Sequence, residues 1–223
     1  MASMTGGPCP GPSNAKMAAL RWAVGSTALD LGCGRGWYAS ALADRGFRVI
    51  GMDRVDQVTD ARIEMHVGDI RPPLPFLDAS FDTVLMFDIL EHLEAEAEIL
   101  SEVRRVCRAG GRVILSVPNA DDAFLPMYGL TYLHRTDRTH LREYTLDGLP
   151  RLLAGFGFRT LYCALEGRTH VPLVFSEFLR GSRAVKTLAR YALVALLRVG
   201  AIHNPNVAGD IHWVGERTAD HAS

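Results

Sequence analysis

Short apolar runs alternate with segments of helical periodicity along most of the chain. Apolar runs of this length between turn residues are typical of strands covered on both faces. They predict strands at residues 27–31 (TALDL), 47–52 (FRVIGM), 63–67, 81–87 (FDTVLMF), 112–117, 158–165 and 211–214. Helices are predicted at 38–45, 93–107 and 146–154. In the second helix Ala97, Leu100 and Val103 recur along one face, and Gly110 and Gly111 are expected to end it.

This alternation predicts an α/β fold, a three-layer sandwich with a mostly parallel sheet between two layers of helices. The chain has 223 residues, of which 48% are hydrophobic and 22% charged, as expected for one globular domain. Residues 14–223 are expected to form that domain, with an insertion at about 168–205. Residues 1–13 are rich in Pro, Gly and Ser and begin like the leader of an expression tag, so they are expected to be flexible.

Charge and cysteine usage exclude several classes of protein. The net charge of −1 does not favour general nucleic-acid binding. The four cysteines are scattered and form no CxxC pair, which disfavours a disulfide framework or a structural zinc site. The N-terminus lacks a basic stretch followed by an apolar run, and no segment has the roughly 18 uninterrupted apolar residues of a spanning helix. We therefore expect a cytoplasmic protein with reduced thiols.

A glycine-rich turn follows the first predicted strand, in the sequence ALDLGCGRG at residues 28–36. Glycines here allow a tight turn and the close approach of a ligand at a helix N-terminus. A dinucleotide site would have its third glycine at position 37, where this chain has Trp37. Asp30 would lie unfavourably near a pyrophosphate. Its carboxylate suits a ligand with an ammonium and a sulfonium, the charges of S-adenosylmethionine.

Two further acidic residues follow predicted strands. Asp53 comes directly after the second strand, where an acidic residue accepts hydrogen bonds from ribose hydroxyls in both ligand classes. Asp69 follows the third strand, and an adenine amino group is its natural donor partner. Asp53 therefore favours an adenosine ligand without deciding between the two classes.

Taken in order, these motifs resemble those of class I S-adenosylmethionine-dependent methyltransferases. The resemblance covers about two thirds of the chain, residues 23–165, and rests on Asp30 to Gly36, Asp53, Gly68 to Ile70, FDTVLMFDILEHL and RAGGRVILSVPN. It implies S-adenosyl-L-methionine as cofactor and a Rossmann-like, seven-stranded sheet whose last strand is antiparallel. It also implies that the methionine end contacts Asp30, Gly32 and Gly34, the ribose Asp53, and the adenine Asp69 and Ile70. Cys33 and Phe87, in the same motifs, complete the candidate cofactor-binding set.

An acidic and histidine-rich sequence follows the fourth strand. If Asp88 opens a helical turn, Asp88, Glu91 and His92 share one face. His140 lies in a later loop that can reach the same edge of the sheet. Three interpretations stay open. Glu91 and His92 can pack beneath the cofactor; His92 or His140 can take a proton from a substrate hydroxyl; or the four residues can bind a divalent metal such as Mg²⁺.

As a metal site, this set of four residues is similar to the sites of two metal-dependent methyltransferase subgroups. One subgroup methylates quinone precursors and the other methylates the ends of small RNAs. Those proteins usually have Glu where this chain has Asp88. We therefore assign no metal ligands from the sequence. The candidate catalytic residues are His140, His92 and Glu91.

The insertion carries an amphipathic pattern over residues 171–201. Apolar residues at 185, 188, 189, 192, 196 and 199 share one helical face, and residues 168–202 contain six basic residues and one acid. Such a helix can close over the acceptor pocket as a lid, form a dimer face, or lie on an anionic membrane. We expect residues 171–205 to form a lid over an apolar pocket.

Aromatic and apolar residues of a preceding loop are expected to line the same pocket: Phe124, Met127, Tyr128 and Tyr132. An O-methyltransferase acting on an aromatic, polyketide-like or prenylated small molecule is therefore predicted, as monomer or homodimer. Arg135, Arg138 and Arg142 keep a phosphate-bearing acceptor open. The alternatives are a metal-assisted methyltransferase for catechols or RNA ends, and a cofactor-binding partner protein without turnover.

Overall fold

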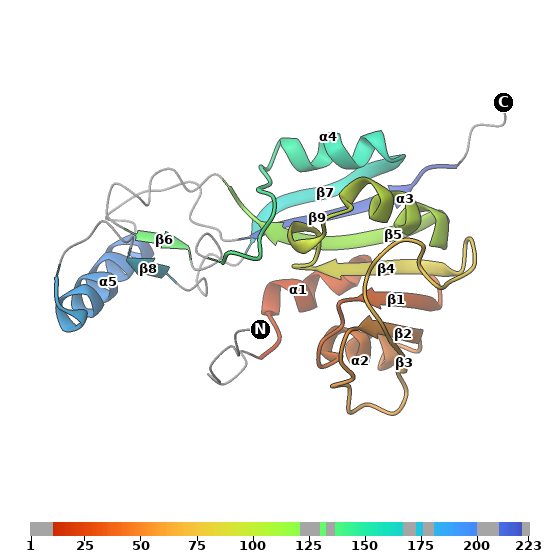
Figure 1. Ribbon diagram of the computed structural model, residues 1–223, viewed down its shortest axis with the longest axis horizontal. Coiled ribbons are helices and arrows are strands. Elements are labelled where there is room, and N and C mark those ends of the chain that lie inside the picture. Colours follow the sequence, from red (N-terminus) through yellow and green to blue (C-terminus); the bar gives the residue numbers. More distant parts are fainter. Residues whose placement is uncertain are drawn as a thin grey trace.

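A computed structural model gives the structure of the chain and describes residues 11–120, 130–132, 137–166, 173–175, 181–199 and 210–219. Seven strands form one sheet in the order β3-β2-β1-β4-β5-β9-β7 (Figure 1). Their bounds are β1 Thr27–Leu31, β2 Arg48–Asp53, β3 Glu64–Val67, β4 Phe81–Phe87, β5 Cys107–Pro118, β7 Phe158–Glu166 and β9 Asp210–Arg217. All neighbours from β3 to β5 pair in parallel, whereas β9 is antiparallel to both β5 and β7. The predicted fold, including its antiparallel last strand, is confirmed.

Helices cover both faces of this sheet. Their bounds are α1 Asn14–Ala19, η1 Leu20–Trp22, α2 Trp37–Ala43, η2 Leu90–His92, α3 Glu96–Val106 and α4 Gly148–Gly155. Strand residues alternate between the two faces. In β1 and β4, Leu29 and Met86 pack with the apolar faces of α3 and α4, whereas Ala28 and Leu85 pack with α1, η1 and α2. Two cores thus lie on either side of the sheet.

The predicted junction between the helix at 93–107 and the strand at 112–117 is wrong. The helix ends at Val106 and β5 begins at Cys107, so Gly110 and Gly111 lie within the strand. The pairing of β5 with β4 shifts register there, between Phe81 and Thr83. A Cβ on Gly111 would lie 2.8–2.9 Å from backbone oxygens, so the irregular strand needs a glycine at this point.

The insertion contributes α5 (Arg183–Arg198) and β8 (Leu173–Phe175), and β8 pairs with β6 (Leu130–Tyr132), from the segment after β5, in a two-stranded sheet. These elements lie at one end of the molecule, beyond the carboxyl ends of β4 and β5 (Figure 1). Phe124, Met127, Tyr128 and Arg135, predicted near the acceptor, lie outside the described residues. In the described part of the chain, no helix has the length and apolar character to cross a bilayer.

Candidate active site

Backbone conformation and hydrogen bonds shape the glycine-rich turn after β1. Gly32, Gly34 and Gly36 have φ values of 73°, 51° and 74°, in the left-handed region that favours glycine. The Gly34 N–H donates a 2.9 Å hydrogen bond to Asp53 Oδ2, and the Gly32 N–H donates one of 2.8 Å to the Met52 carbonyl. The turn is thus tied to the end of β2, and at Gly34, where an added Cβ would meet no heavy atom within 4 Å, it leaves space for a ligand.

Asp30 places a buried carboxyl beneath this turn. The residue is 2% exposed, and among the described residues its Oδ2 has no hydrogen-bond partner. Burial raises its pKa to about 7, although a backbone hydrogen bond from Ala39 opposes the shift. A cation bound here would supply the missing partner. Asp30 therefore fits the positive methionine end of S-adenosylmethionine.

The other two predicted carboxylates have partners in the protein. Asp53, at the end of β2, accepts from Gly34 and from the Val55 N–H. Asp69 forms ion pairs with Arg54 and Arg71, each with an N–O distance of 3.0 Å. Both carboxylates lie on the edge of the sheet where a nucleoside would bind. Their contacts to ribose and adenine stay predictions.

The predicted apolar contacts also lie near this edge. Ile70 and Phe87 are each 8% exposed, and Phe87 packs against Tyr38 with ring centroids 4.7 Å apart. Cys33 is buried beside Met65, with 3.5 Å between the sulfur atoms, and burial raises the pKa of its thiol. These side chains offer apolar surface, and Cys33 stays protonated.

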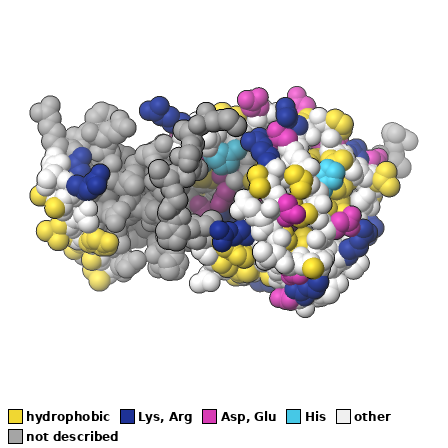
Figure 2. All heavy atoms as spheres, turned by 60° about the horizontal axis from the view of Figure 1, so that its bottom comes forward, with side chains coloured by type: hydrophobic (Ala, Val, Ile, Leu, Met, Phe, Trp, Pro, Cys, Tyr) yellow, Lys and Arg dark blue, Asp and Glu magenta, His cyan; other side chains and the backbone are white. Residues whose placement is uncertain are grey.

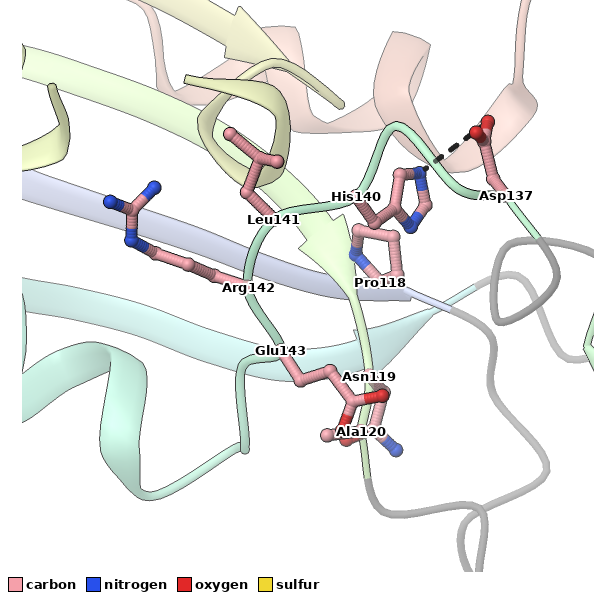
Figure 3. A pocket seen from close by; sticks show the side chains of 8 residues that line it. All are labelled: Pro118, Asn119, Ala120, Asp137, His140, Leu141, Arg142 and Glu143. Atoms are coloured by element: carbon pink, nitrogen blue, oxygen red, sulfur yellow. Dashed lines mark ion pairs between the residues drawn. The ribbon is translucent and has the colours of Figure 1, made fainter. Parts of the chain in front are cut away.

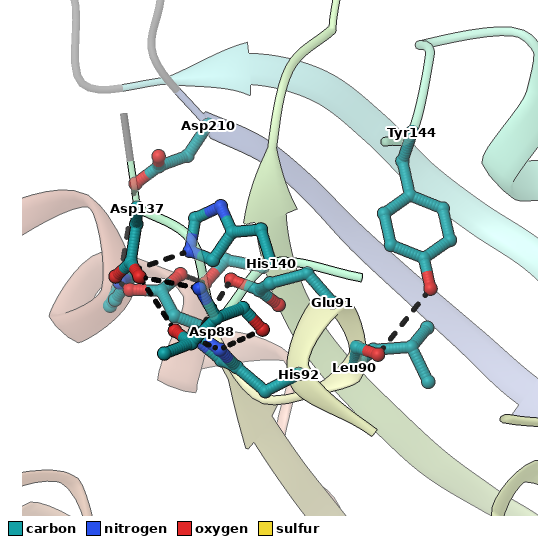
Figure 4. Close-up of polar contacts among 11 residues, drawn as sticks. Asp88, Leu90, Glu91, His92, Asp137, His140, Tyr144 and Asp210 are labelled. Atoms are coloured by element: carbon teal, nitrogen blue, oxygen red, sulfur yellow. Dashed lines mark hydrogen bonds and ion pairs between the residues drawn. The ribbon is translucent and has the colours of Figure 1, made fainter. Parts of the chain in front are cut away.

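Glu91, His92 and His140 meet in one cluster, called the acid–histidine cluster below. One ligand atom from each residue lies within 4.8 Å of the others (Figure 4). Glu91 is 1% exposed and neither of its carboxyl oxygens has a hydrogen-bond partner among the described residues. Burial, and to a lesser extent Asp88, raises its pKa to about 8. The predicted convergence of these three residues is confirmed.

Thr139 orients one ring of this cluster. The Nδ1 atom of His92 lies 3.0 Å from the Thr139 hydroxyl and 3.2 Å from its carbonyl oxygen. The Leu141 N–H donates to the Glu91 carbonyl and joins the loop of His140 to η2. Burial and the neighbouring His92 lower the pKa of His140 despite the nearby Asp137. His140 is therefore neutral, and able to accept a proton, at neutral pH.

Asp88 does not share the helical face predicted for it, and this part of the prediction is wrong. Its φ of 54° turns the backbone at the end of β4, and its carboxylate pairs with the Lys16 ammonium and accepts a 2.7 Å bond from the Ser116 hydroxyl. Lys16 Nζ also lies 4.0 Å from Asp210. Asp88 is outside the acid–histidine cluster because this ammonium holds it.

Sequence reasoning missed Lys16 and Asp210. Lys16 is 7% exposed on the short helix α1, and burial lowers its pKa less than Asp88 and Asp210 raise it. One feature of the sequence could have drawn attention to Lys16. The basic residues of this chain are nearly all Arg, and only Lys16 and Lys186 are lysines.

A pocket opens beside the acid–histidine cluster at the end of β5. Figure 3 shows the side chains that line it: Pro118, Asn119, Ala120, Asp137, His140, Leu141, Arg142 and Glu143. Arg142 is held by the carbonyls of Leu93 and Glu94, so it is a fixed part of the wall. The pocket combines polar and apolar surface and includes His140. It is therefore a candidate acceptor site.

The donor set also fits a divalent metal. A buried carboxyl without a hydrogen-bond partner among the described residues and two imidazoles, one of them 4.0 Å from that carboxyl, are oxygen and nitrogen ligands of the kind that divalent cations bind. Three protein ligands leave room for an acceptor oxygen or water. The arrangement can thus support proton transfer by His140 or metal binding by all three residues.

Comparisons with known proteins identify the family. The profile of a family described as methyltransferase domain matches residues 14–162. A protein of Mycolicibacterium smegmatis, named a probable S-adenosylmethionine-dependent methyltransferase, is 40% identical over 60% of this chain and 52% of its own length. Another protein with that description, from Mycobacterium tuberculosis, is 32% identical over 86% of this chain and 67% of its own. The chain thus spans about half to two thirds of these relatives.

Solved structures agree on the fold. A Haloferax volcanii methyltransferase, in complex with the activator Trm112, has a TM-score of 0.66 at 17% identity and covers 94% of this chain and 89% of its own. The Burkholderia thailandensis 1,6-didemethyltoxoflavin-N1-methyltransferase, with bound S-adenosylhomocysteine, has a TM-score of 0.60 at 17% identity. The match covers 92% of this chain and 78% of that protein. From its family match and these relatives, the chain belongs to the class I S-adenosylmethionine-dependent methyltransferases.

Proposed function

We propose that this protein is an O-methyltransferase in which His140 takes the proton from a hydroxyl of a small, fairly apolar acceptor. The observation that carries the proposal is the position of His140, in the wall of the pocket and within the acid–histidine cluster. S-adenosylmethionine supplies an activated methyl group. Asp30 and the glycine-rich turn hold its charged end, and the carboxylates of Asp53 and Asp69 bind its nucleoside.

The reaction then needs one positioned base. With the cofactor bound, a bond would form between the acceptor oxygen and the methyl carbon as the bond from that carbon to sulfur breaks, and His140 would take the hydroxyl proton. The lowered pKa of His140 keeps its imidazole neutral before the step. Pro118, Ala120 and Leu141 give the acceptor apolar contacts. Asn119 and Glu143 limit the polar groups that it can carry at that end.

The experiment follows transfer of a deuterated methyl group to a panel of phenols, catechols, hydroxylated polyketides and prenylated phenols by mass spectrometry. We expect methylation of at least one class. In His140→Ala we expect kcat to fall about 10²- to 10⁴-fold with unchanged affinity for S-adenosylhomocysteine. His66→Ala, which removes a histidine on β3 beside Phe76, is the matched control. Cofactor binding without turnover on any acceptor would favour the non-catalytic partner protein.

The acid–histidine cluster favours a second candidate, a metal-assisted methyltransferase. In this alternative Glu91, His92 and His140 hold a divalent cation, which would orient an acceptor hydroxyl and lower its pKa. A catechol or an RNA-end hydroxyl would be the acceptor. Activity that is lost with a chelator and restored by Mg²⁺ or Mn²⁺ would support this candidate. Turnover that is insensitive to chelator would leave His140 as a metal-free base.

A further inference from the structure

The helix α5 exposes its apolar side. Five large apolar side chains are exposed on or just after it: Val185 (62%), Leu188 (74%), Tyr191 (62%), Leu196 (40%) and Val199 (77%). At the helical rotation of about 100° per residue, all five fall within an arc of about 140°. We call these five residues the α5 apolar stripe. A helix in a globular protein normally turns such a stripe toward the core.

The half-buried residues of α5 lie on another side of the helix. Lys186, Ala189 and Leu193 are half-buried, and the helix packs against β8. Their positions occupy an arc next to the stripe rather than within it. In the described part of the chain, α5 is therefore held by one side while the α5 apolar stripe faces outward. Figure 2 shows hydrophobic side chains gathered at this end of the molecule, with basic side chains beside them.

The charge of α5 indicates which kind of surface this helix can bind. α5 contains four basic residues and no acidic one, in a chain whose net charge is −1. Three basic positions, Arg183, Lys186 and Arg190, fall on the side of the helical wheel opposite the apolar stripe, and Arg198 falls at the edge of the stripe. A short helix with one apolar and one basic side matches the boundary between lipid headgroups and acyl chains. A second copy of the chain fits poorly, because pairing two α5 helices would bring eight positive charges together.

We propose that α5 is an interfacial helix that docks the protein on an anionic membrane surface. The apolar stripe enters the level of the acyl chains, and long basic side chains reach back to the anionic headgroups. α5 lies beyond the carboxyl ends of β4 and β5, on the same side of the sheet as the acid–histidine cluster (Figure 1). Docking would thus bring the lipid surface to the end of the sheet that carries the pocket. This inference does not depend on which acceptor is methylated.

Vesicle flotation of the full chain tests the proposal. The probes are vesicles of phosphatidylcholine alone and vesicles with about one third phosphatidylglycerol. We expect binding to the anionic vesicles, weakened by salt. Leu188→Asp should lower the partition coefficient at least tenfold, as should the double variant Arg183→Glu with Lys186→Glu. Leu77→Asp is the matched control, because Leu77 is 83% exposed outside the insertion, and it should bind like the unmodified protein.

Unchanged affinity for S-adenosylhomocysteine shows that each variant is folded. Three results would overturn the proposal: absence of binding to anionic vesicles, binding that both α5 variants retain, or equal binding to neutral vesicles. A fourth such result would come from light scattering. A dimer that Leu188→Asp dissociates, with no vesicle binding, would assign the α5 apolar stripe to a second copy of the chain.

Discussion

The imidazole rings of His92 and His140 meet edge to face, with their centroids 4.6 Å apart (Figure 4). One ring comes from η2, directly after β4, and the other from the loop that precedes α4. Since each ring limits the movement of the other, a change at one is transmitted to the second. His92 also contributes, after burial, to the lowered pKa of His140, because a positive charge on His140 is disfavoured beside this ring.

Glu91 is the cluster residue whose replacement separates the metal-bound and metal-free mechanisms. Glu91→Gln removes the carboxylate ligand and keeps the shape of the side chain. If the cluster binds a cation, affinity for Mn²⁺ should fall about 10- to 100-fold, as measured by calorimetry. Glu98→Gln, an exposed carboxyl on α3, is the matched control. Equal Mn²⁺ affinity in both variants would rule out Glu91 as a ligand.

Asp30 is predicted to lower the stability of the cofactor-free protein, because its charge is buried without a cation. Its ordinary pKa of 3.8 becomes about 7 in the fold, so the folded protein holds this proton more tightly than the unfolded chain does. The resulting stability is complete below about pH 4 and is lost as the pH rises through 7. Asp30→Asn stays neutral, and at pH 8 it should raise the free energy of unfolding by about 2–4 kcal/mol.

Thermal unfolding at pH 5 and pH 8 measures this effect, and the gain in Tm should be larger at pH 8. The same variant should lose most of its affinity for S-adenosylhomocysteine, whose ammonium would no longer have a carboxylate partner. An unchanged Tm at pH 8 would contradict the cost assigned to the buried charge. Unchanged affinity would contradict the role of Asp30 in binding.

Lys16 is predicted to stabilise the fold because its ammonium neutralises two carboxylates. Lys16→Met leaves Asp88 and Asp210 without their cation. Lys16 is buried but the two carboxylates are 43% and 27% exposed, so the loss should be about 1–3 kcal/mol, less than for a fully buried pair. Adding Asp88→Asn removes one of the two charges and should restore part of the loss. Urea unfolding of the two variants measures both effects. A single variant as stable as the unmodified protein would contradict this account.

Gly34 and Gly46 provide a matched pair for the cofactor site. Both have positive φ, 51° and 88°, and a Cβ on either would have no heavy atom within 4 Å. Replacement by Ala should therefore cost both about 1–2 kcal/mol of stability. Only Gly34→Ala should lower affinity for S-adenosylhomocysteine, because its methyl group would enter the space between the turn and the ligand. If a calorimetric titration gives both variants the same affinity for S-adenosylhomocysteine, the cofactor does not bind against Gly34.

Much of this architecture could be predicted because local signals and tertiary structure agree. The runs TALDL and FDTVLMF are buried strands, and the glycines after the first of them adopt the positive φ that a tight turn requires. His140 could be associated with Glu91 and His92 because parallel strands place their carboxyl ends, and the loops that follow, at one edge. These predictions rest on periodicity and on topology.

The remainder depends on contacts that no local pattern encodes. Asp88 adopts a left-handed backbone and turns to Lys16, a partner 72 residues away. The six residues of α1 are too few for a reliable periodicity, so the helix carrying that ammonium was not predicted. Gly110 and Gly111 signal a helix end by composition, yet the pairing of Cys107 with Phe81 extends β5 across them.

The position of β9 confines the insertion between two paired strands. The chain leaves the sheet after β7, passes through α5, and returns to place β9 between β5 and β7. The insertion is therefore enclosed by two strands whose register is fixed by pairing along their length. We expect substitutions, additions and deletions in it to leave the pairing of the seven strands in place. A different helix inserted at α5 would then change this end of the molecule while the glycine-rich turn keeps its conformation.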